Sequence, residues 1–151
     1  MLSEAAFSRT ISIAGLIERV VAESADSLDA ALYRLNNIRL MAALAKQGDQ
    51  GVRIRLILDR GKYESDSDTR SGLANHRLPF RLLGGRLGRG SKMHHKFAVL
   101  DSRIVLTGSY NWTTESDAEN LENLLILREP AQVQQYQEEF EALWNEAEKN
   151  A

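Results

Sequence analysis

Apolar residues follow a helical spacing in three parts of the chain. The first is residues 13–21, where Ile, Leu and Val recur on one face. The second follows Asn36 and Asn37, either of which can cap a helix that ends near Gly48. The third begins at Pro130. Its predicted packing face consists of Val133, Tyr136, Phe140, Leu143 and Trp144.

Short apolar runs between these helices predict strands. The runs at 28–35 and 52–59 flank the second helix, and a strand, a helix and a strand within about thirty residues indicate a parallel pair with a right-handed crossover. The polar stretch 60–75 fits either a surface loop or a short helix. Further strands are expected at 78–83, 97–100, 104–106 and 121–127.

These elements and the chain length predict one domain over residues 1–151. A chain of 151 residues that is 43% hydrophobic can bury a core without disulfides or metal. The expected fold class is α/β, with a mixed, largely parallel central sheet and helices on both faces.

The segment 92–112 predicts a hairpin, because two apolar runs flank a turn at residues 101–103. Side chains alternate along a strand. If the first strand begins at His94, then His94 and Lys96 point to one face and His95 points to the other. An imidazole and an ammonium would thereby be directed at the same place.

The second strand of the hairpin leads into Ser109 and Asn111, whose hydroxyl and amide groups donate hydrogen bonds. Together with His94 and Lys96 they could converge on one anion. Glu122 opens the next apolar run, and a carboxylate entering such a strand is costly unless it is paired. His94 or Lys96 is the expected partner of Glu122.

The net charge of −2 is unevenly distributed along the chain. Residues 70–100 include seven basic residues and no Asp or Glu. Within this block, the glycine-rich segment 84–91 is either an ordinary connection or a cationic loop that closes over a phosphate backbone. Arg86, Arg89 and Lys92 are therefore candidate substrate-binding residues. A basic block on a mildly acidic protein indicates a polyanion partner, with surface solubility as the alternative.

Composition excludes several kinds of chemistry. The chain contains no cysteine, which excludes disulfides, thiolate zinc sites and a cysteine nucleophile. The histidines and carboxylates show no ligand spacing, so neither a metal nor another cofactor is expected. No run reaches the length of a membrane span, and the first residues lack the features of a secretory signal. We expect a cytoplasmic protein without stable membrane association.

The pattern His94-x-Lys96-x4-Asp101-x6-Gly108-Ser109-x-Asn111 resembles the HKD motif of the phospholipase D superfamily. The strand at 51–59 and the pair Glu122-Asn123 extend the resemblance to roughly residues 7–145. A short chain with one motif is most similar to the bacterial nuclease branch and to the mitochondrial Zucchini-type proteins. The resemblance implies a phospholipase D-like sandwich. Asp101 falls at the turn, so we expect it to support the local structure through hydrogen bonds or a charge pair.

The roles implied by the resemblance agree with the physical chemistry of phosphodiesters. Their charge repels anionic nucleophiles, so a neutral imidazole among cations is a suitable attacking group. His94 would attack phosphorus and form a phosphohistidine. Lys96, Ser109 and Asn111 would hold the non-bridging oxygens. Glu122 would bond the far nitrogen of His94 and fix its tautomer.

The leaving alkoxide also needs a proton, and one His94 cannot attack and protonate from opposite sides of the same phosphorus. His95 should face away, and His76 lies in no comparable motif. Superfamily members with one motif resemble half of the two-motif enzymes and combine two copies in one active site. We therefore expect a homodimer in which one His94 is the nucleophile and the other is the general acid.

The predicted function is that of a metal-independent phosphodiesterase, an endonuclease that cleaves DNA or RNA with little sequence preference. The same residues would also serve a phospholipid phosphodiesterase of the phospholipase D or cardiolipin hydrolase type, although no lipid-anchoring segment is evident. A third alternative is a nucleic-acid-binding module of a larger restriction or repair protein. The intact motif weighs against this third alternative.

Overall fold

Eight strands and six helices make up the fold within residues 3–150, which the computed structural model describes except for the side chains of Arg89 and residues 148–150. The strands are β1 (Glu4–Phe7), β2 (Ser27–Leu32), β3 (Arg53–Asp59), β4 (Phe80–Gly85), β5 (Gly88–Lys92), β6 (Lys96–Leu100), β7 (Ile104–Gly108) and β8 (Asn123–Leu127). The helices are α1 (Ile13–Ala22), α2 (Ile38–Asp49), α3 (Arg60–Ser65), α4 (Ser67–His76), α5 (Thr114–Ala118) and α6 (Pro130–Asn150).

The strands form one mixed sheet in the order β1-β8-β7-β6-β2-β3-β4-β5. The parallel pair β2–β3 is present as predicted, and β3–β4 is parallel too. Every other neighbouring pair in the described sheet is antiparallel, so the sheet has less parallel pairing than the sequence pattern predicted. The reason is that β4–β5 and β6–β7 are joined by tight turns, and short connections join only antiparallel strands.

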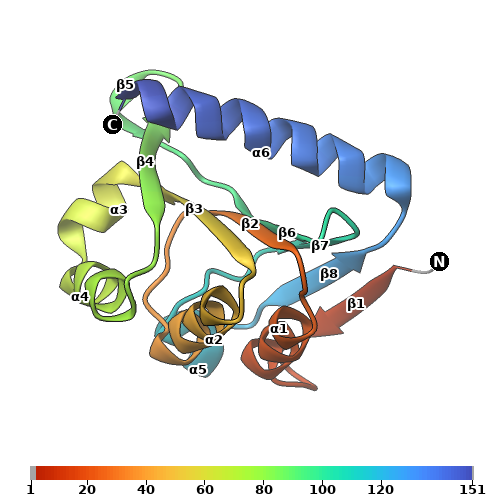
Figure 1. Ribbon diagram of the computed structural model, residues 1–151. Coiled ribbons are helices and arrows are strands. Elements are labelled where there is room, and N and C mark those ends of the chain that lie inside the picture. Colours follow the sequence, from red (N-terminus) through yellow and green to blue (C-terminus); the bar gives the residue numbers. More distant parts are fainter. Residues whose placement is uncertain (1–2, 151) are drawn as a thin grey trace.

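Helices cover both faces of the sheet, which confirms the predicted α/β class. Figure 1 shows α6 across one face and α1 with α2 across the other. The strands divide their side chains accordingly. Along β6, Ala98 and Leu100 join the core that includes α1 and α2, while Phe97 and Val99 join the core beneath α6. Phe140 of α6 is fully buried there, as the helix pattern predicted.

Helix α2 begins where the sequence predicted and ends slightly later. The side chain of Asn37 accepts hydrogen bonds from the backbone N–H groups of Arg39 and Leu40, so Asn37 is the capping residue. Gly48 was expected to end this helix but lies inside it. The terminal glycine is Gly51, with a φ of 96° that other residues adopt only with strain.

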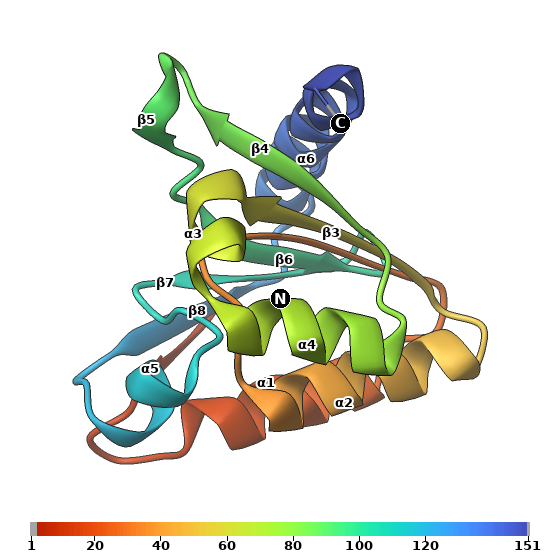
Figure 2. The same ribbon diagram turned by 90° about the vertical axis from the view of Figure 1, so that its left-hand side faces the viewer.

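The two ambiguous segments both form regular structure. Residues 60–75 contain α3 and α4, which are capped by Asp59 and Asp66. The glycine-rich segment 84–91 is not a loop but the turn and part of the second strand of the β4–β5 hairpin. The Ser91 hydroxyl fixes the turn by accepting from the Leu87 N–H at 3.0 Å. Figure 2 shows this hairpin projecting from the end of the sheet.

A buried ion network attaches α6 to the sheet. Asp29 of β2 is completely buried and accepts hydrogen bonds from Arg55 Nε at 2.8 Å and from Gln137 Nε2 of α6 at 2.9 Å. Arg55 also pairs with Glu141 of α6 and lies over the Phe140 ring. The hydrogen bonds that Arg55 donates to Asp29 raise the pKa of Arg55, so the guanidinium stays charged. The network fixes the C-terminal helix across the strands that carry the site.

Candidate active site

The predicted site residues gather at one edge of the sheet. Leu32, at the end of β2, pairs with Leu58 near the end of β3 and with Lys96 at the start of β6. At the same edge β7 ends and β8 begins, where Gly108 pairs with Leu124. Open α/β sheets commonly bind ligands beyond the carboxyl ends of their parallel strands. The β2 and β3 ends provide such a position here.

His94 and Lys96 point to the same place, as the alternation predicted. Lys96 Nζ lies 3.3 Å from His94 Nδ1 and donates to the His94 carbonyl oxygen at 3.1 Å. His94 lies just before β6 rather than in it. The ring of His95 packs edge-on against Phe97, and its carbonyl oxygen accepts from the Tyr33 N–H at 2.7 Å. His95 therefore stabilises the segment from the other side.

The surroundings of His94 favour the neutral imidazole. Burial lowers its pKa, and the positive charges of Lys96 and Lys92 lower it further. Burial also lowers the pKa of Lys96, and the negative charge of Glu122 opposes that change. A neutral imidazole carries a free lone pair, so His94 has the electronic state required of a nucleophile or a base.

Ser109, Glu122 and Asn123 form a second polar group at this edge. The Ser109 hydroxyl donates to Glu122 Oε1 at 2.5 Å and accepts from the Asn123 N–H at 3.0 Å. The expected hydrogen bond between His94 and Glu122 is absent among the described residues, where Glu122 accepts from Ser109 instead. β7 and β8 approach closely at this point, since a Cβ on Gly108 would lie 2.4 Å from the Asn123 carbonyl oxygen.

The motif places Asp101 away from the other site residues. Asp101 lies at the far end of β6, and its carboxylate accepts from the backbone N–H groups of Ala25, Asp26 and Ser27 at 2.7–3.2 Å. Burial raises the pKa of Asp101, but these hydrogen bonds outweigh burial and hold the pKa below the usual value. The predicted supporting hydrogen bonds are thus present.

Asn111 lies beyond the end of β7, and its side-chain oxygen is buried without a hydrogen-bond partner among the described residues. A buried acceptor in this state is costly. The amide is therefore poised to gain a hydrogen bond when another group enters the site.

The cations of the basic block do not form one surface. Arg70 donates to two backbone carbonyls of α3, and Arg81 donates to the Trp144 carbonyl with its guanidinium 3.7 Å from that ring centre. Both arginines hold helices in place.

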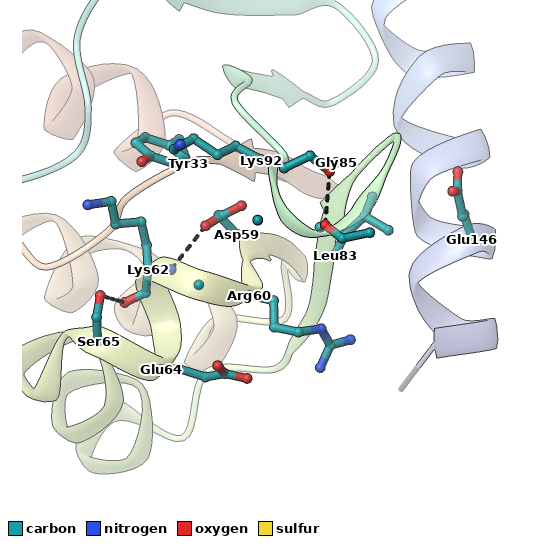
Figure 3. A pocket seen from close by; sticks show the side chains of 15 residues that line it. Tyr33, Asp59, Arg60, Lys62, Glu64, Ser65, Leu83, Gly85, Lys92 and Glu146 are labelled. Carbon is teal, nitrogen blue, oxygen red and sulfur yellow. Dashed lines mark hydrogen bonds between the residues drawn. The ribbon is translucent and has the colours of Figure 1, made fainter.

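A cleft of about 610 Å³ opens beside the site, between α3, the β4–β5 hairpin and α6 (Figure 3). Of the three candidate substrate-binding residues, Lys92 lines this cleft. Arg86 is exposed at the hairpin tip and does not line it. The side chain of Arg89 is outside the described part of the chain.

Three residues near His94 were not predicted from the sequence. The Tyr33 ring centre lies 4.4 Å from that of His94, and Lys62 Nζ lies 5.6 Å from the Tyr33 ring centre. Asp59 is buried and accepts from the Met93 N–H at 2.9 Å and from the Lys62 N–H at 3.0 Å. The available signal for Asp59 was a carboxylate directly after an apolar strand. Tyr33 follows an equally apolar run, and its sequence context resembles that of a core residue.

Within residues 3–150, no three His, Asp or Glu side chains are grouped in a way that could hold a metal ion. In the same residues, we find no helix that is both long enough and apolar enough to traverse a bilayer.

Residues 17–144 match the family model described as the PLD-like domain of cardiolipin synthase. The chain belongs to this family. Mitochondrial cardiolipin hydrolase of Xenopus tropicalis is 35% identical over 147 residues, which cover 95% of this chain and 63% of that protein. The same protein of Mus musculus is 32% identical over 95% of this chain and 60% of its own length. This PLD-domain chain thus spans about 60% of the length of these curated relatives.

Solved structures share the fold. Nuc from Salmonella typhimurium, a phospholipase D family member, superposes with a TM-score of 0.84 at 22% identity, over 95% of this chain and 94% of that one. NucT from Helicobacter pylori superposes with a TM-score of 0.81 at 18% identity, over 95% of this chain and 97% of that one. The predicted phospholipase D-like sandwich is thereby confirmed.

Proposed function

We propose that this PLD-domain chain acts as one domain that cleaves phosphodiesters through a phosphohistidine. The observation that carries the proposal is the neutral His94 imidazole with the Lys96 ammonium 3.3 Å from Nδ1. In the first step a nitrogen of His94 forms a bond to phosphorus while the bond to the leaving oxygen breaks. Water then attacks the phosphohistidine, and His94 leaves as the free imidazole.

The neighbouring donors stabilise the charge that develops on the non-bridging oxygens. Lys96 supplies a positive charge, and the Asn111 side-chain amide supplies N–H donors from beyond the end of β7. The Ser109 hydroxyl donates its hydrogen to Glu122, so it reaches a non-bridging oxygen only when it turns away from that carboxylate. The chemistry does not call for a divalent cation, because an ammonium beside the imidazole repels one and provides the same charge stabilisation. Glu122 acts through Ser109, whose hydroxyl it orients.

A second copy of the chain completes the reaction. The leaving alkoxide needs a proton, and the described residues bring no second imidazole to the face that His94 shares with Lys96. In a homodimer, the His94 of the other copy serves as the general acid. When water attacks, this second His94, which has given up its proton, serves as the general base.

Nucleic acid is the substrate class that the cleft supports best. Charged side chains of both signs line it, Lys62 and Lys92 among them, and among the described lining residues Leu83 is the only aliphatic side chain. Such a surface suits a hydrophilic polyanion rather than acyl chains. The function is therefore that of an endonuclease with little sequence preference. Cleavage of a phospholipid is the second candidate, which the printed names of the cardiolipin hydrolase relatives favour.

Incubation of the protein with plasmid DNA and with single-stranded DNA and RNA in excess EDTA tests this proposal. Cleavage is expected in EDTA, and His94→Ala should reduce the rate by about a thousandfold or more. His76→Ala, which removes an imidazole at the end of α4, serves as the matched control and should retain activity. Loss of wild-type activity in EDTA, or full activity of His94→Ala, would refute the mechanism.

Labelled cardiolipin and phosphatidylcholine vesicles form the second arm of the experiment. Cleavage of either lipid with no cleavage of nucleic acid would overturn the endonuclease assignment in favour of the lipid candidate. The His94→Ala control applies to both arms, because either substrate would use the same nucleophile.

A further inference from the structure

Charged side chains of both signs line the cleft beside the site. In Figure 3 the Lys62 and Lys92 side chains extend on the side of Tyr33, with the Asp59 carboxylate between them. Glu64, Glu146 and the Arg60 guanidinium lie on the other side of the cleft. A phosphate entering the cleft would be attracted toward Tyr33 and repelled from the carboxylates. The two lysines beside Tyr33 are therefore one position at which the cleft can hold an anion.

This cationic end lies next to His94. The Tyr33 ring centre is 4.4 Å from the His94 ring centre and 5.6 Å from Lys62 Nζ, so Lys62 Nζ lies at most about 10 Å from the His94 ring. Lys96 Nζ lies 5.5 Å from the same Tyr33 ring centre. The ammonium groups of Lys62 and Lys96 thus both lie near the ring of Tyr33.

The backbone holds these groups in a fixed relation. Tyr33 is only 8% exposed, and its N–H donates to the His95 carbonyl oxygen. The buried Asp59 carboxylate accepts from the N–H of Lys62 and from that of Met93, the residue before His94. The start of α3 and the segment that carries His94 therefore share one anchor.

Neither cleft lysine is neutralised within the described part of the chain. No ion pair or side-chain hydrogen bond joins Lys62 or Lys92 to another described residue, although acidic side chains line the same cleft. The charge of Lys92 reaches His94, whose pKa it helps to lower. Two lysines without counter-ions beside a phosphodiester site are a binding position for further negative charge.

We propose that Tyr33, Lys62 and Lys92 form a subsite for a second phosphate, the one that neighbours the scissile phosphate along a nucleic-acid strand. The subsite rests on the proposed nuclease function and specifies its substrate. We therefore expect faster cleavage of a phosphodiester when the neighbouring phosphate of the strand can lie in the cleft. A dinucleoside monophosphate, which has no such phosphate, is a poor substrate.

Short thymidine substrates test the subsite. TpT has one phosphodiester, whereas pTpT and TpTp add a phosphate on one side or the other. Wild-type kcat/KM should be on the order of tenfold higher for one of the two phosphorylated forms than for TpT. Lys62→Met and Lys92→Met should each remove most of this preference. Lys46→Met removes an exposed lysine of α2 outside the cleft, and this variant should retain the wild-type preference for the phosphorylated form.

Two kinetic results would overturn the proposal. One is equal kcat/KM of the wild type for TpT, pTpT and TpTp. The other is a kcat/KM of Lys62→Met and Lys92→Met that falls by the same factor for all three substrates, which would indicate general damage to the site. A third result would overturn the assignment to nucleic acid. In it, the wild type cleaves cardiolipin faster than phosphatidylglycerol, Lys62→Met loses this preference, and the three oligonucleotides show no preference at all.

Equilibrium binding separates failure of the subsite from failure of the proposed function. His94→Ala protein is titrated with fluorescently labelled TpT, pTpT and TpTp. Tighter binding of one phosphorylated form, lost when Lys62→Met is added, supports the subsite even if the wild type cleaves none of the three. Equal binding of all three refutes the subsite even if His94-dependent cleavage of longer DNA is observed.

Discussion

The neutral state of His94 sets the expected pH dependence of the reaction. Burial and the charges of Lys96 and Lys92 lower its pKa below the ordinary histidine value of 6.5. Because attack requires the deprotonated imidazole, kcat/KM should fall as pH drops through the lowered pKa of His94. The acid limb of the kcat/KM profile is therefore expected below pH 6.5.

Substitution of Lys96 tests the cause of this shift. In the proposed mechanism Lys96 stabilises the non-bridging oxygens, so Lys96→Met should lower the rate. It should also move the acid limb to higher pH by removing one of the charges that lower the pKa of His94. Lys46→Met removes a remote charge of the same kind and should leave the limb in place. An acid limb above pH 6.5 in the wild type, or an unmoved limb in Lys96→Met, would contradict the assignment to His94.

At the level of residues, the sequence predicted contacts that depend on local geometry. His94 and Lys96 are two positions apart beside a strand, so the alternation of side chains alone directs them to one place. Of the two expected partners of Glu122, Lys96 senses its charge, while among the described residues its hydrogen bond is with Ser109 rather than His94. The Ser109 contact follows from the pairing of β7 with β8, which the sequence pattern does not reveal. Tyr33 was missed because its proximity to His94 follows from pairing between strands far apart in the sequence.

At the level of elements, the turn between β6 and β7 depends on Asp101. This residue has a φ of 55°, a region that Asn tolerates far better than Ala. Asp101→Asn should retain the backbone conformation of the turn but weaken the hydrogen bonds that the side chain accepts from residues 25–27. It should lower the free energy of unfolding by about 1–2 kcal/mol at pH 7. Asp101→Ala adds backbone strain and should cost more. Urea titration measures both differences.

The pH dependence provides the check on this prediction. The folded-state pKa of Asp101 is lowered, so its stabilisation is present above the ordinary carboxyl pKa and is lost as pH falls through the lowered one. The stability difference between wild type and Asp101→Asn should therefore shrink in acid. A difference that is absent at pH 7, or that grows in acid, would disprove the role of the carboxylate.

The junction of β7 and β8 requires a glycine at position 108. A Cβ there would lie 2.4 Å from the Asn123 carbonyl oxygen, so Gly108→Ala should push the strands apart and misplace Ser109 relative to Glu122. We expect at least a tenfold loss of kcat/KM, on the order of the loss of one charge-assisted hydrogen bond, together with lower stability. Gly51→Ala is the control, because Gly51 also has a positive φ but lies far from the site with nothing within 4 Å of the added Cβ. Equal losses of activity in both variants would contradict the prediction.

Elements with a strong periodic pattern were predicted well, and their connections were not. Helices α1, α2 and α6 and the β2–α2–β3 unit follow directly from spacing and capping residues. The glycine-rich segment 84–91 lacks an apolar pattern, so its pairing with β4 could not be foreseen. The position of α3 beside the site depends on Asp59, which serves at once as the end of β3 and as a helix cap.

At the level of the whole molecule, the site borders an exposed apolar groove. Phe7 and Leu121, which are 54% and 82% exposed, line this groove together with Glu122. Exposed large apolar side chains beside polar site residues are typical of a surface that another protein covers. The proposed second copy of the chain would cover it while it brings a second His94 to the site.

Mixing active and inactive subunits tests whether two copies share one site. After subunit exchange in an equal mixture of wild type and His94→Ala, about a quarter of the dimers carry two His94 residues, so activity should fall to about a quarter of the wild-type value at the same total protein. Independent sites would give about half. A mixture with His76→Ala controls for dilution and should stay near full activity. Light scattering should give the mass of two chains, and a one-chain mass with half activity would exclude the shared site.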